Sequence, residues 1–404
     1  MSKLEQLIKE LCPNGVEWKT VEEIFNLKNG YTPSKANKEY WENGTVPWFR
    51  MEDLRTNGNI LNDAVQHIHT SGVRGKLFPA NSIIMATTAT IGEHALITVD
   101  YMSNQQFTNF ALRDDICELI DTKFAYYYFF ILDEKAKQAV NTSSFPSVQM
   151  EQLKKWDFPL PPLPVQEEIV RILDNFTELT AELTAELTAE LTARRKQYEY
   201  YRDLLLTFGN NPDIKWMTLG EIGPVCMCKR IMKAETSPVG DVPFFKIGTF
   251  GKEPDAFISQ EKYDEYRKAF SFPKKGDILI SAAGTIGRTV IYDGKPAYYQ
   301  DSNIVWIDND ESKVLNKYLY YCYAMKPWSI STGGTIARLY NDNISKAKIP
   351  VPPLEEQERI VAILDRFDAL CNDLTSGIPA EIEARQKQYE YYRDKLLSFK
   401  EVTA

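Results

Sequence analysis

The sequence predicts an α+β fold that is written twice. Two similar globular domains are separated and followed by long helices, which we expect to pack as an antiparallel coiled coil with pseudo-two-fold symmetry. Three observations predict this fold: an internal repeat at constant offset, an unbroken helical stretch, and short strand-like runs in each globular half. The chain's 404 residues are enough for two or three domains.

The internal repeat is the strongest signal. Residues 158–176 read FPLPPLPVQEEIVRILDNF, and residues 349–367 read IPVPPLEEQERIVAILDRF. Residues 193–208 read ARRKQYEYYRDLLLTF, and residues 384–399 read ARQKQYEYYRDKLLSF. Both pairs have the same offset of 191 positions. Such a repeat predicts the order domain, helix, domain, helix.

Prolines mark where each domain gives way to a helix. They gather in the PLPPL and PVPPL turns and favour extended backbone there. We therefore expect a first domain at 1–158, a central spacer helix at 159–208, a second domain at 209–348, and a C-terminal helical region at 349–404 that repeats the central one.

The central helix contains the tetrapeptide ELTA four times in succession, from Glu178 to Ala193. Ala, Glu and Leu are strong helix formers. No Gly or Pro interrupts the run between Val165 and Phe208, so one helix of about 60 Å is expected. The C-terminal region carries Gly377 followed by Pro379 at the matching place, which predicts a break in the second arm near Gly377.

Each arm also carries an apolar stripe at helical spacing. Tyr198, Tyr201, Leu205 and Phe208 form the first stripe, and Tyr389, Tyr392, Leu396 and Phe399 form the second. The spacing i, i+3, i+7, i+10 is typical of a seam between two helices. We expect the two arms to pack on each other, antiparallel.

The globular halves contain matching short runs rich in Ile, Val and Thr, each bounded by Gly, Asn or Asp. The expected strands are 82–85, 94–99 and 108–112 in the first half, and 277–281, 289–292 and 303–307 in the second. An aromatic helix follows in each half, at 123–130 and at 317–323. Fainter matches place Arg50 opposite Lys246, and Gln105 opposite Gln300.

Charge and composition limit the kinds of partner that the chain can bind. The net charge is −9, but residues 159–215 and 349–404 together contribute −8 and the two globular halves are neutral together. Either half could therefore carry a basic face. No apolar run is long enough to cross a membrane, the N-terminus lacks a signal peptide, and six scattered cysteines suit reduced thiols. These features predict a cytoplasmic protein.

Motifs for catalysis are missing from the sequence. There is no phosphate-binding loop ending in Gly-Lys-Ser/Thr, no Rossmann glycine pattern and no Asn-Pro-Pro-Tyr-type tetrapeptide of methyltransferases. His67 and His69 alternate along a strand-like run without nearby carboxylate or thiolate ligands, so no metal site is expected. We predict no catalytic residue in this chain.

Binding residues are the remaining candidates. Arg can grip guanine bidentately, Gln and Asn can grip adenine, and Lys and hydroxyls hold phosphates. In the first half, the candidates for contacting DNA are Tyr31, Ser34, Lys35, Arg50, Thr88 and Gln105. In the second half they are Arg230, Lys233, Lys246, Arg288, Gln300 and, at the end of the loop 333–338, Arg338. Each of these is also an ordinary surface residue type.

The octapeptide KQYEYYRD is identical at 196–203 and 387–394. A recent duplication alone would explain the identity. A seam needs only the apolar members, however, and an identical polar surface shown twice suits one partner bound in two copies. The candidates for this contact are Lys196, Glu199, Arg202, Lys387, Glu390 and Arg393.

Together, the ELTA run and the order of variable domain, PLPPLxxQExIVxIL-type helix, variable domain and the same helix again resemble the specificity subunit of type I restriction-modification enzymes. The resemblance covers the whole chain, and the ELTA run is similar to the Thr-Ala-Glu-Leu repeats of one subfamily. It implies two target-recognition domains that each read one half of a split site in double-stranded DNA. It also implies that the helices space these domains.

The resemblance further implies partners and places catalysis in them. Two modification subunits would dock on the helices, and motor-nuclease restriction subunits would join the complex. S-adenosylmethionine, ATP and Mg²⁺ would belong to those subunits, and this chain would bind no cofactor and no metal. Two alternatives stay open: a self-sufficient DNA-modifying enzyme, and a coiled-coil scaffold without a DNA role.

Overall fold

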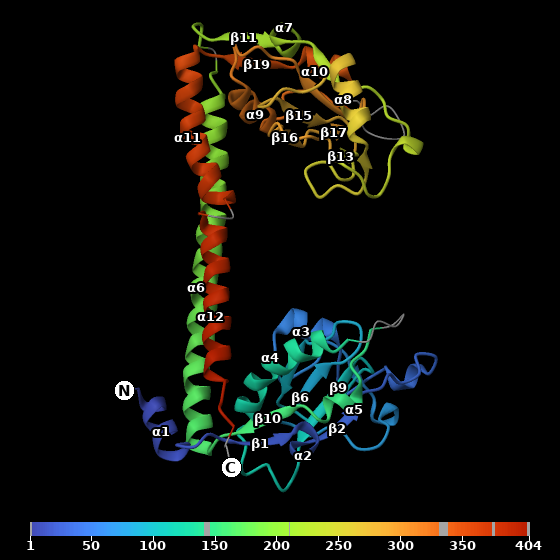
Figure 1. Cartoon of the computed structure of the whole chain (residues 1–404), viewed down its shortest axis with the longest axis vertical. Coiled ribbons are helices and arrows are strands. Elements are labelled where there is room, and N and C mark those ends of the chain that lie inside the picture. The colour runs from blue at the N-terminus through green and yellow to red at the C-terminus, as the bar shows by residue number, and fades with distance from the viewer. Residues whose placement is uncertain (1, 141–145, 210, 331–337, 374–375, 402–404) are drawn as a thin grey trace. The chain divides into compact units, whose positions relative to one another are not determined.

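The structure, a computed structural model, describes residues 2–140, 146–209, 211–330, 338–373 and 376–401. They fall into two compact units. Unit 1 combines Met1–Ala185 with Glu383–Ala404, and unit 2 spans Glu186–Ile382. Each unit contains one globular domain and the helical segments that pack on it (Figure 1).

Unit 1 contains most of its elements in the first 160 residues. Its helices are α1 (Lys3–Leu11), α2 (Val21–Ile24), α3 (Met51–Asn57), α4 (Thr122–Gln138) and α5 (Met150–Leu153), with short 3-10 turns η1 (Lys38–Tyr40) and η2 (Thr70–Gly72). Its strands are β1 (Glu17–Thr20), β2 (Phe25–Asn29), β3 (Val46–Phe49), β4 (Ile60–Leu61), β5 (His67–Ile68), β6 (Ser82–Ala86), β7 (His94–Ile97), β8 (Met102–Ser103), β9 (Phe107–Leu112) and β10 (Asp157–Leu160).

The main sheet of unit 1 has the strand order β2-β9-β6-β7-β4, antiparallel except for the parallel pair β4 and β7. Every residue of β6 is buried, because the sheet has a core on both faces. Ile83 and Met85 belong to the core on the side of α4 and the central helix, whereas Ile84 and Ala86 belong to the core beneath the small sheet β5-β3-β8. Successive side chains of a strand point to opposite faces, which explains the alternation.

Unit 2 repeats these elements with one strand fewer in its main sheet. Its helices are α7 (Leu219–Ile222), α8 (Gln260–Ala269), α9 (Asn316–Ala324), α10 (Asn341–Lys346) and α11 (Leu354–Asn372), with the 3-10 turn η3 (Lys233–Glu235). Its strands are β11 (Lys215–Thr218), β12 (Val225–Met227), β13 (Val242–Phe245), β14 (Phe257–Ile258), β15 (Ile278–Ser281), β16 (Thr289–Ile291), β17 (Tyr298–Tyr299), β18 (Ile304–Ile307) and β19 (Lys348–Val351).

The strand order of unit 2 matches the first four strands of the main sheet of unit 1 and all three strands of its small sheet. The main sheet is β12-β18-β15-β16, and the small sheet is β14-β13-β17. In the small sheets β3 runs parallel to β8, and β13 runs parallel to β17. Leu279 of β15 again faces a different core from its neighbours Ile278 and Ile280. The two domains are therefore two copies of one fold.

The six predicted strands are confirmed as β6, β7, β9, β15, β16 and β18, and the two aromatic helices as α4 and α9. The sequence predicted only extended backbone at the proline-rich turns. In the structure these turns contain β10 and β19, each of which pairs antiparallel with the strand that opens its domain. Trp18 lies opposite Pro159, and Trp216 lies opposite Pro350.

As predicted, the first helical arm is continuous and the second is broken. The central helix α6 (Leu163–Leu206) is unbroken over 44 residues. In the second arm α11 ends at Asn372 and α12 (Ile378–Leu396) begins six positions later. Gly377 lies in this break, where an added Cβ would come within 2.7 Å of the carbonyl oxygens of Ala369 and Asp373.

The leucine row of the ELTA run is only partly covered. Leu179 is 60% exposed, while Leu183, Leu187 and Leu191 are half-buried. A spacing of four residues exceeds the helical repeat of about 3.6, so each leucine is rotated about 40° from the one before. The row therefore winds around α6 and does not form a straight seam.

A buried glutamine joins each domain to its helix. Gln166 of α6 is fully buried; its Nε2 donates to the carbonyl oxygens of Leu119 and Pro161, and its Oε1 accepts from the N–H of Asp121. Gln357 of α11 makes the same three bonds in unit 2, to Lys313, Pro352 and Leu315. These are the Gln positions of the repeated PLPPLxxQE pattern.

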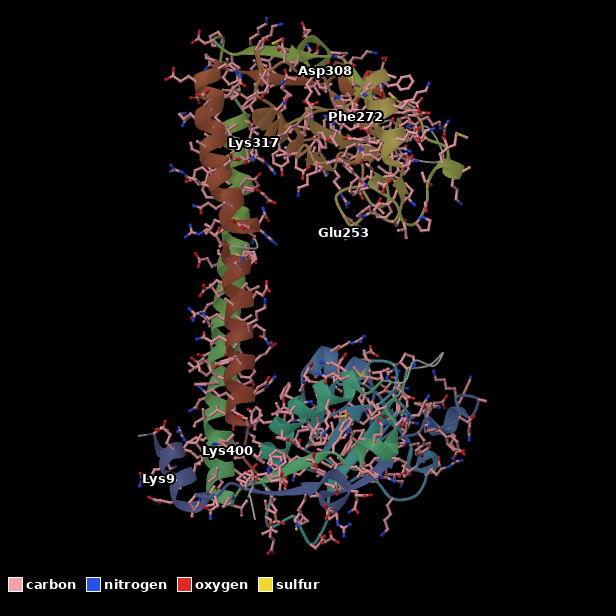
Figure 2. All side chains as sticks on the ribbon, viewed as in Figure 1. Lys9, Glu253, Phe272, Asp308, Lys317 and Lys400 are labelled. Atoms are coloured by element: carbon pink, nitrogen blue, oxygen red, sulfur yellow. The ribbon has the colours of Figure 1, made fainter. Side chains whose placement is uncertain are left out.

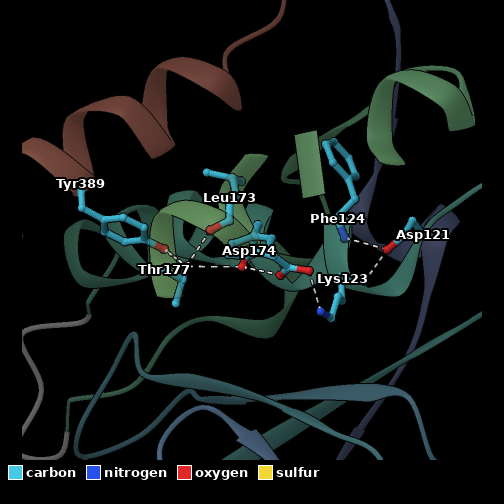
Figure 3. Close-up of polar contacts among 8 residues, drawn as sticks. Asp121, Lys123, Phe124, Leu173, Asp174, Thr177 and Tyr389 are labelled. Carbon is cyan, nitrogen blue, oxygen red and sulfur yellow. Dashed lines mark hydrogen bonds and ion pairs between the residues drawn. The ribbon is translucent and has the colours of Figure 1, made fainter. Parts of the chain in front are cut away.

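A second repeated contact lies about two turns further along each helix. In unit 1 Lys123 of α4 donates to the carboxylate of Asp174 at 2.7 Å (Figure 3). The hydroxyl of Tyr127, on the same helix, donates to this carboxylate at 2.8 Å. In unit 2 Lys317 of α9 pairs with Asp365 of α11 at 3.1 Å, and Tyr321 donates to the same carboxylate (Figure 2 labels Lys317). Burial raises the pKa of both tyrosines, so both hydroxyls stay protonated and donate.

The seam tyrosines pack within each unit. Tyr389 exchanges a hydrogen bond with Thr177 at 2.9 Å (Figure 3), and Tyr392 packs on Phe176. Residue numbers rise on α6 as they fall on α12, so this pair of helices is antiparallel. In unit 2 Tyr201 stacks on Phe367 of α11. The antiparallel seam is confirmed.

Residues after α12 complete unit 1. The N–H of Val16 donates to the carbonyl oxygen of Lys400 at 2.9 Å, and Leu397 lies in the main core. Lys3 of α1 forms an ion pair with Glu168 at 2.7 Å. Among the described residues, no helix combines the length and apolar character that a membrane span requires.

Candidate nucleic-acid interface

A polar pocket of about 640 Å³ opens beside the small sheet of unit 1. The buried indole ring of Trp48 on β3 lines this pocket, and we refer to the buried aromatic ring on this middle strand as the floor. The other lining residues come from the loop before β3 (Thr32, Lys35, Lys38, Trp41 and Glu42), from the end of β3 (Arg50), from the residue before β5 (Gln66) and from the turn after β8 (Asn104, Gln105 and Gln106). The lining thus contains three cations, four side-chain amides and one carboxylate.

A pocket of about 590 Å³ lies at the matching place in unit 2. Its floor is Phe244 of β13. The other lining residues are Arg230, Ile231, Met232, Lys233, Thr236, Ser237 and Pro238 of the segment after β12, Lys246 after β13, Asp255 and Ala256 before β14, and Gln300 and Asp301 after β17. Here three cations face two carboxylates and a more apolar wall.

Strand register shows which positions of the two pockets correspond. The N–H of Trp48 donates to the carbonyl oxygen of Gln66, and the N–H of Phe244 donates to that of Ala256. Arg50 and Lys246 both lie two residues beyond these floor positions, as the sequence predicted.

One predicted match is wrong by one residue. The N–H of Asn104 donates to the carbonyl oxygen of Phe49. The N–H of Gln300 donates to the carbonyl oxygen of Phe245, which is the counterpart of Phe49. Gln300 therefore corresponds to Asn104, and Gln105 corresponds to Asp301. The turns after β8 and β17 are too short for sequence spacing to define their register.

Arg50 is held in place at the edge of the first pocket. Its guanidinium lies 5.7 Å from the centre of the Trp48 ring, and its Nη2 contacts Glu52 at 2.7 Å. Its Nε is buried and finds no hydrogen-bond partner within the part of the chain that the structure describes. Arg50 is thus oriented by an aromatic face and one carboxylate while retaining an unused donor.

The second pocket contains more internal ion pairs. Lys246 Nζ pairs with Asp255 at 2.8 Å, and Arg230 Nε lies 3.7 Å from Asp301. The Oε1 of Gln300 accepts from the N–H of Ile247 at 3.0 Å, so the amide nitrogen of Gln300 points away from Ile247. Glu253, labelled in Figure 2, lies on the loop between Lys246 and Asp255.

Seven of the twelve DNA candidates line these pockets: Lys35, Arg50 and Gln105 in unit 1, and Arg230, Lys233, Lys246 and Gln300 in unit 2. The remaining five lie elsewhere. Tyr31 donates its hydroxyl to the carbonyl oxygen of Gly72, and burial raises its pKa. Ser34 is exposed beside the first pocket. The backbone of Thr88 forms an isolated antiparallel β-bridge with that of Ser147.

Arg288 and Arg338 hold the fold of unit 2. Arg288 Nη1 donates to the carbonyl oxygen of Phe250 at 2.9 Å, and Arg338 Nη2 donates to that of Ser302 at 2.8 Å. Both guanidinium groups are half-buried. Residues 333–337 of the expected recognition loop lie outside the described residues.

Sequence reasoning missed several pocket residues, above all Gln66 and Asp301. Gln66 comes just before β5, which has only two residues, and Asp301 follows the equally short β17. Lys38 and Trp41 come from the loop around η1. Only the pairing of these short strands brings the four residues to the pockets, and the sequence does not reveal that pairing.

The repeated octapeptide surface is exposed in part. Lys196, Glu199 and Lys387 are exposed, and Lys387 pairs with Glu383 at 2.5 Å. Tyr200 and Tyr391, at equivalent positions, are 64% and 60% exposed. These two tyrosines were not among the predicted contact residues.

The two arginines of the octapeptide are less accessible. Arg393 is buried, and its guanidinium lies 4.3 Å from the centre of the Phe130 ring. Arg202 is half-buried over the Tyr198 ring and bonds Asp203. Glu390 is half-buried and accepts from Gln386. Arg393 is thus occupied inside unit 1, which leaves little of it for a partner.

No cluster of three or more His, Cys, Asp or Glu side chains suited to a metal ion occurs among the described residues. The sequence predicted no carboxylate near His67, and this detail is wrong: Asp63 lies 2.7 Å from its Nε2. One carboxylate and one imidazole are too few ligands for a structural metal. Burial raises the pKa of Cys228 and Cys322 to about 12, so these thiols are not nucleophiles at neutral pH.

Comparison with known proteins agrees with this geometry. The family described as "Type I restriction modification DNA specificity domain" matches the chain twice, over residues 13–193 and 211–384. Each match contains one globular domain and the helix that follows it.

Similar proteins extend over nearly the whole chain. A type I restriction enzyme specificity subunit of Haemophilus influenzae is 45% identical over 97% of this chain and 98% of its own length. The EcoprrI specificity subunit of Escherichia coli is 39% identical over 93% of each. The EcoR124I/EcoR124II specificity subunit of Escherichia coli is 30% identical over 99% of this chain and 98% of its own length.

Solved structures share the fold. A chain from a study of complex assembly and conformational transition of the type I R-M system has a TM-score of 0.69 at 18% identity, covering 95% of this chain and 98% of that one. The HsdS subunit of Thermoanaerobacter tengcongensis has a TM-score of 0.51 at 17% identity, covering 95% and 96%. This protein belongs to the family of type I restriction-modification specificity subunits, which are the non-catalytic DNA-recognition components of those systems.

Proposed function

We propose that the two pockets are the base-reading sites of a bipartite DNA target, one half-site for each unit. The supporting observation is that both pockets occupy one position in a repeated fold, yet are lined by different side chains. A shared frame with different linings is what two half-sites of different sequence require. Lys35, Lys38 and Lys233, which are exposed at the rims, would contact phosphates.

We further propose that the exposed part of the octapeptide docks two modification subunits, one on each copy. Lys196 with Tyr200, and Lys387 with Tyr391, present the same exposed pair twice, and Glu199 is exposed beside the first pair. Tyrosine is enriched at protein interfaces because its ring is apolar and its hydroxyl polar. Restriction subunits would join this complex. S-adenosylmethionine, ATP and Mg²⁺ would be bound by the partner subunits.

The four parts expected from the sequence serve as functional divisions in this proposal. Residues 1–158 and 209–348 read DNA, and residues 159–208 and 349–404 space the two readers and bind partners. The number of ELTA copies would set the unread gap between the half-sites.

Methylation mapping tests the proposal. The chain is co-expressed with its modification subunit, and the DNA is sequenced for modified bases. A split motif with two short blocks and a fixed gap is expected. An assembled complex that leaves no methylation would refute the recognition role and favour a coiled-coil scaffold. Methylation by the purified chain alone would instead revive the self-sufficient enzyme.

A further inference from the structure

We infer that the pocket of unit 1 reads an A·T base pair through Gln66 and Gln105, and that the pocket of unit 2 reads a G·C pair through Asp301 and Arg230. This inference rests on the proposed reading of one half-site by each unit. It goes further, because it assigns a base pair to each pocket from the side chains that differ between them.

The shared frame makes the differences informative. Each pocket has an aromatic floor on the middle strand of the small sheet, a cation two residues beyond it, and an amide after the third strand. These common positions are Trp48 and Phe244, Arg50 and Lys246, and Asn104 and Gln300. Groups common to both pockets cannot by themselves distinguish two different half-sites.

At two further matched positions the side-chain chemistry changes between the pockets. Gln66 of unit 1 is replaced by Ala256 in unit 2, since both accept the hydrogen bond from the N–H of the floor residue. Gln105 is replaced by Asp301, since each directly follows the matched pair Asn104 and Gln300. Unit 1 therefore has two amides where unit 2 has a methyl group and a carboxylate.

The amides of unit 1 match the major-groove edge of adenine. Adenine presents an acceptor at N7 and a donor at N6, and a Gln amide supplies a donor and an acceptor in the complementary order. The Oε1 of Gln105 accepts from the hydroxyl of Thr32, which orients the amide. A carbonyl oxygen has a second lone pair and can still accept from adenine. Gln66 is half-buried in the same pocket and no hydrogen bond of its side chain competes with a base among the described contacts.

The charged pair of unit 2 matches a G·C pair. A carboxylate accepts from the N4 amino group of cytosine, and an arginine donates to O6 and N7 of guanine. Arg230 Nε pairs with Asp301 at 3.7 Å, which is too long for a hydrogen bond, so both groups retain hydrogen-bonding capacity for a ligand. The Arg230 side chain is 72% exposed and that of Asp301 is 22% exposed. The two side chains are therefore placed to contact the two bases of one pair.

A carboxylate also sets an electrostatic condition. Asp301 near the phosphate backbone would repel DNA unless a donor engages it. With Arg230 engaged by guanine, the N4 amino group of cytosine supplies that donor. A base pair without a donor facing Asp301 would leave the carboxylate desolvated and unpaired, which disfavours the wrong sequence.

Methylation mapping of pocket variants in the assembled complex tests the inference. Gln66→Ala is expected to relax one A·T position of one half-site by on the order of 10- to 100-fold in discrimination. Asp301→Asn is expected to relax one G·C position of the other half-site to a similar extent. Ala is compatible with the backbone at position 66, because unit 2 has Ala256 at the equivalent place.

Controls separate reading from folding and from general affinity. Lys38→Ala, at the rim of the first pocket, should lower methylation at all sites without relaxing any position. Gln105→Ala should relax the same half-site as Gln66→Ala and replaces that variant if it does not assemble. The inference is wrong if active Gln66→Ala and Gln105→Ala complexes keep full discrimination, if the position that they relax is G·C, or if Asp301→Asn relaxes the same half. A wild-type complex that methylates no split motif refutes the proposed function itself, which is a different result.

Discussion

Tyr392 of α12 packs edge-on against Phe176 of α6, with ring centroids 6.4 Å apart. Tyr201 and Phe367, the residues 191 positions away from each of these two, form the reciprocal pair, stacked at 5.6 Å. Each repeat thus places the tyrosine at the end of one arm on the phenylalanine near the start of the other. The same aromatic contact therefore occurs once in each unit.

The contact between Phe176 and Tyr392 should be measurable by a double-mutant cycle. Aromatic pairs couple by about 0.5–1.5 kcal/mol, and we expect about 0.5 kcal/mol here because both rings are over one-third exposed. The free energy of unfolding of wild type, Phe176→Ala, Tyr392→Ala and the double variant gives the coupling. Tyr200→Ala combined with Phe176→Ala is the matched control and should be additive. Additivity of Phe176→Ala with Tyr392→Ala would contradict the contact.

Replacing either buried glutamine should be strongly destabilising. Gln166→Ala leaves two carbonyl oxygens and one N–H without partners, and each unsatisfied buried group costs about 1–3 kcal/mol. We expect a loss of at least about 3 kcal/mol, and a similar loss for Gln357→Ala. Denaturant unfolding measures both. Gln152→Ala, on the exposed face of α5, should change stability little; equal effects at positions 152 and 166 would refute the role of the buried amide.

Stability should fall in acid through Glu168. Hydrogen bonds from Arg171 and Lys3 lower its pKa to about 2 from the ordinary 4.5. A carboxylate whose pKa is lower when folded contributes stability above its unfolded pKa and loses that contribution as pH falls towards the folded value. We therefore expect Glu168→Gln to flatten the pH dependence of unfolding between about pH 4.5 and pH 2. The exposed neighbour Glu167 is the control, and Glu167→Gln should keep the wild-type slope; a Glu168→Gln variant that keeps it too would contradict the assignment.

Deleting one repeat, Thr184 to Leu187, should change the gap in the DNA target. Four helical residues advance about 6 Å and turn about 400°, a net 40°, while one base pair of B-DNA turns roughly 35°. One repeat is therefore nearly in phase with one base pair, and we expect the unread gap to shorten by one. The rise exceeds the roughly 3.4 Å step of DNA, so distortion must absorb the difference. Methylation mapping measures the gap, and an unchanged gap in an active complex would disprove the spacer role.

Local signals in the sequence were sufficient for most of the fold. The six strands follow from Ile- and Val-rich runs between turn residues, and the break at Gly377 follows from Gly and Pro. The two-residue strands β8 and β17 carry no such signal, which is why Gln105 was matched to Gln300 one position out of register. Tertiary pairing alone defines that register.

The candidate site was harder to predict for a related reason. An arginine on a loop has the same sequence signature whether it faces DNA or its own backbone. Arg230 lines a pocket, whereas Arg288 and Arg338 donate to carbonyl oxygens of unit 2, and Arg393 lies over Phe130. Only the position of nearby acceptors and rings in the fold separates these cases.

Unit 1 is formed by two separate segments of the chain, and this affects how it folds during synthesis on the ribosome. Unit 2 is one contiguous segment, Glu186–Ile382, whereas unit 1 also needs Glu383–Ala404. Domains generally fold in the order in which they emerge, but the N–H of Val16 can meet Lys400 only after unit 2 has been translated. The first domain to be made is therefore the last to be completed, and until then the nascent chain exposes the part of its core that Leu397 will cover.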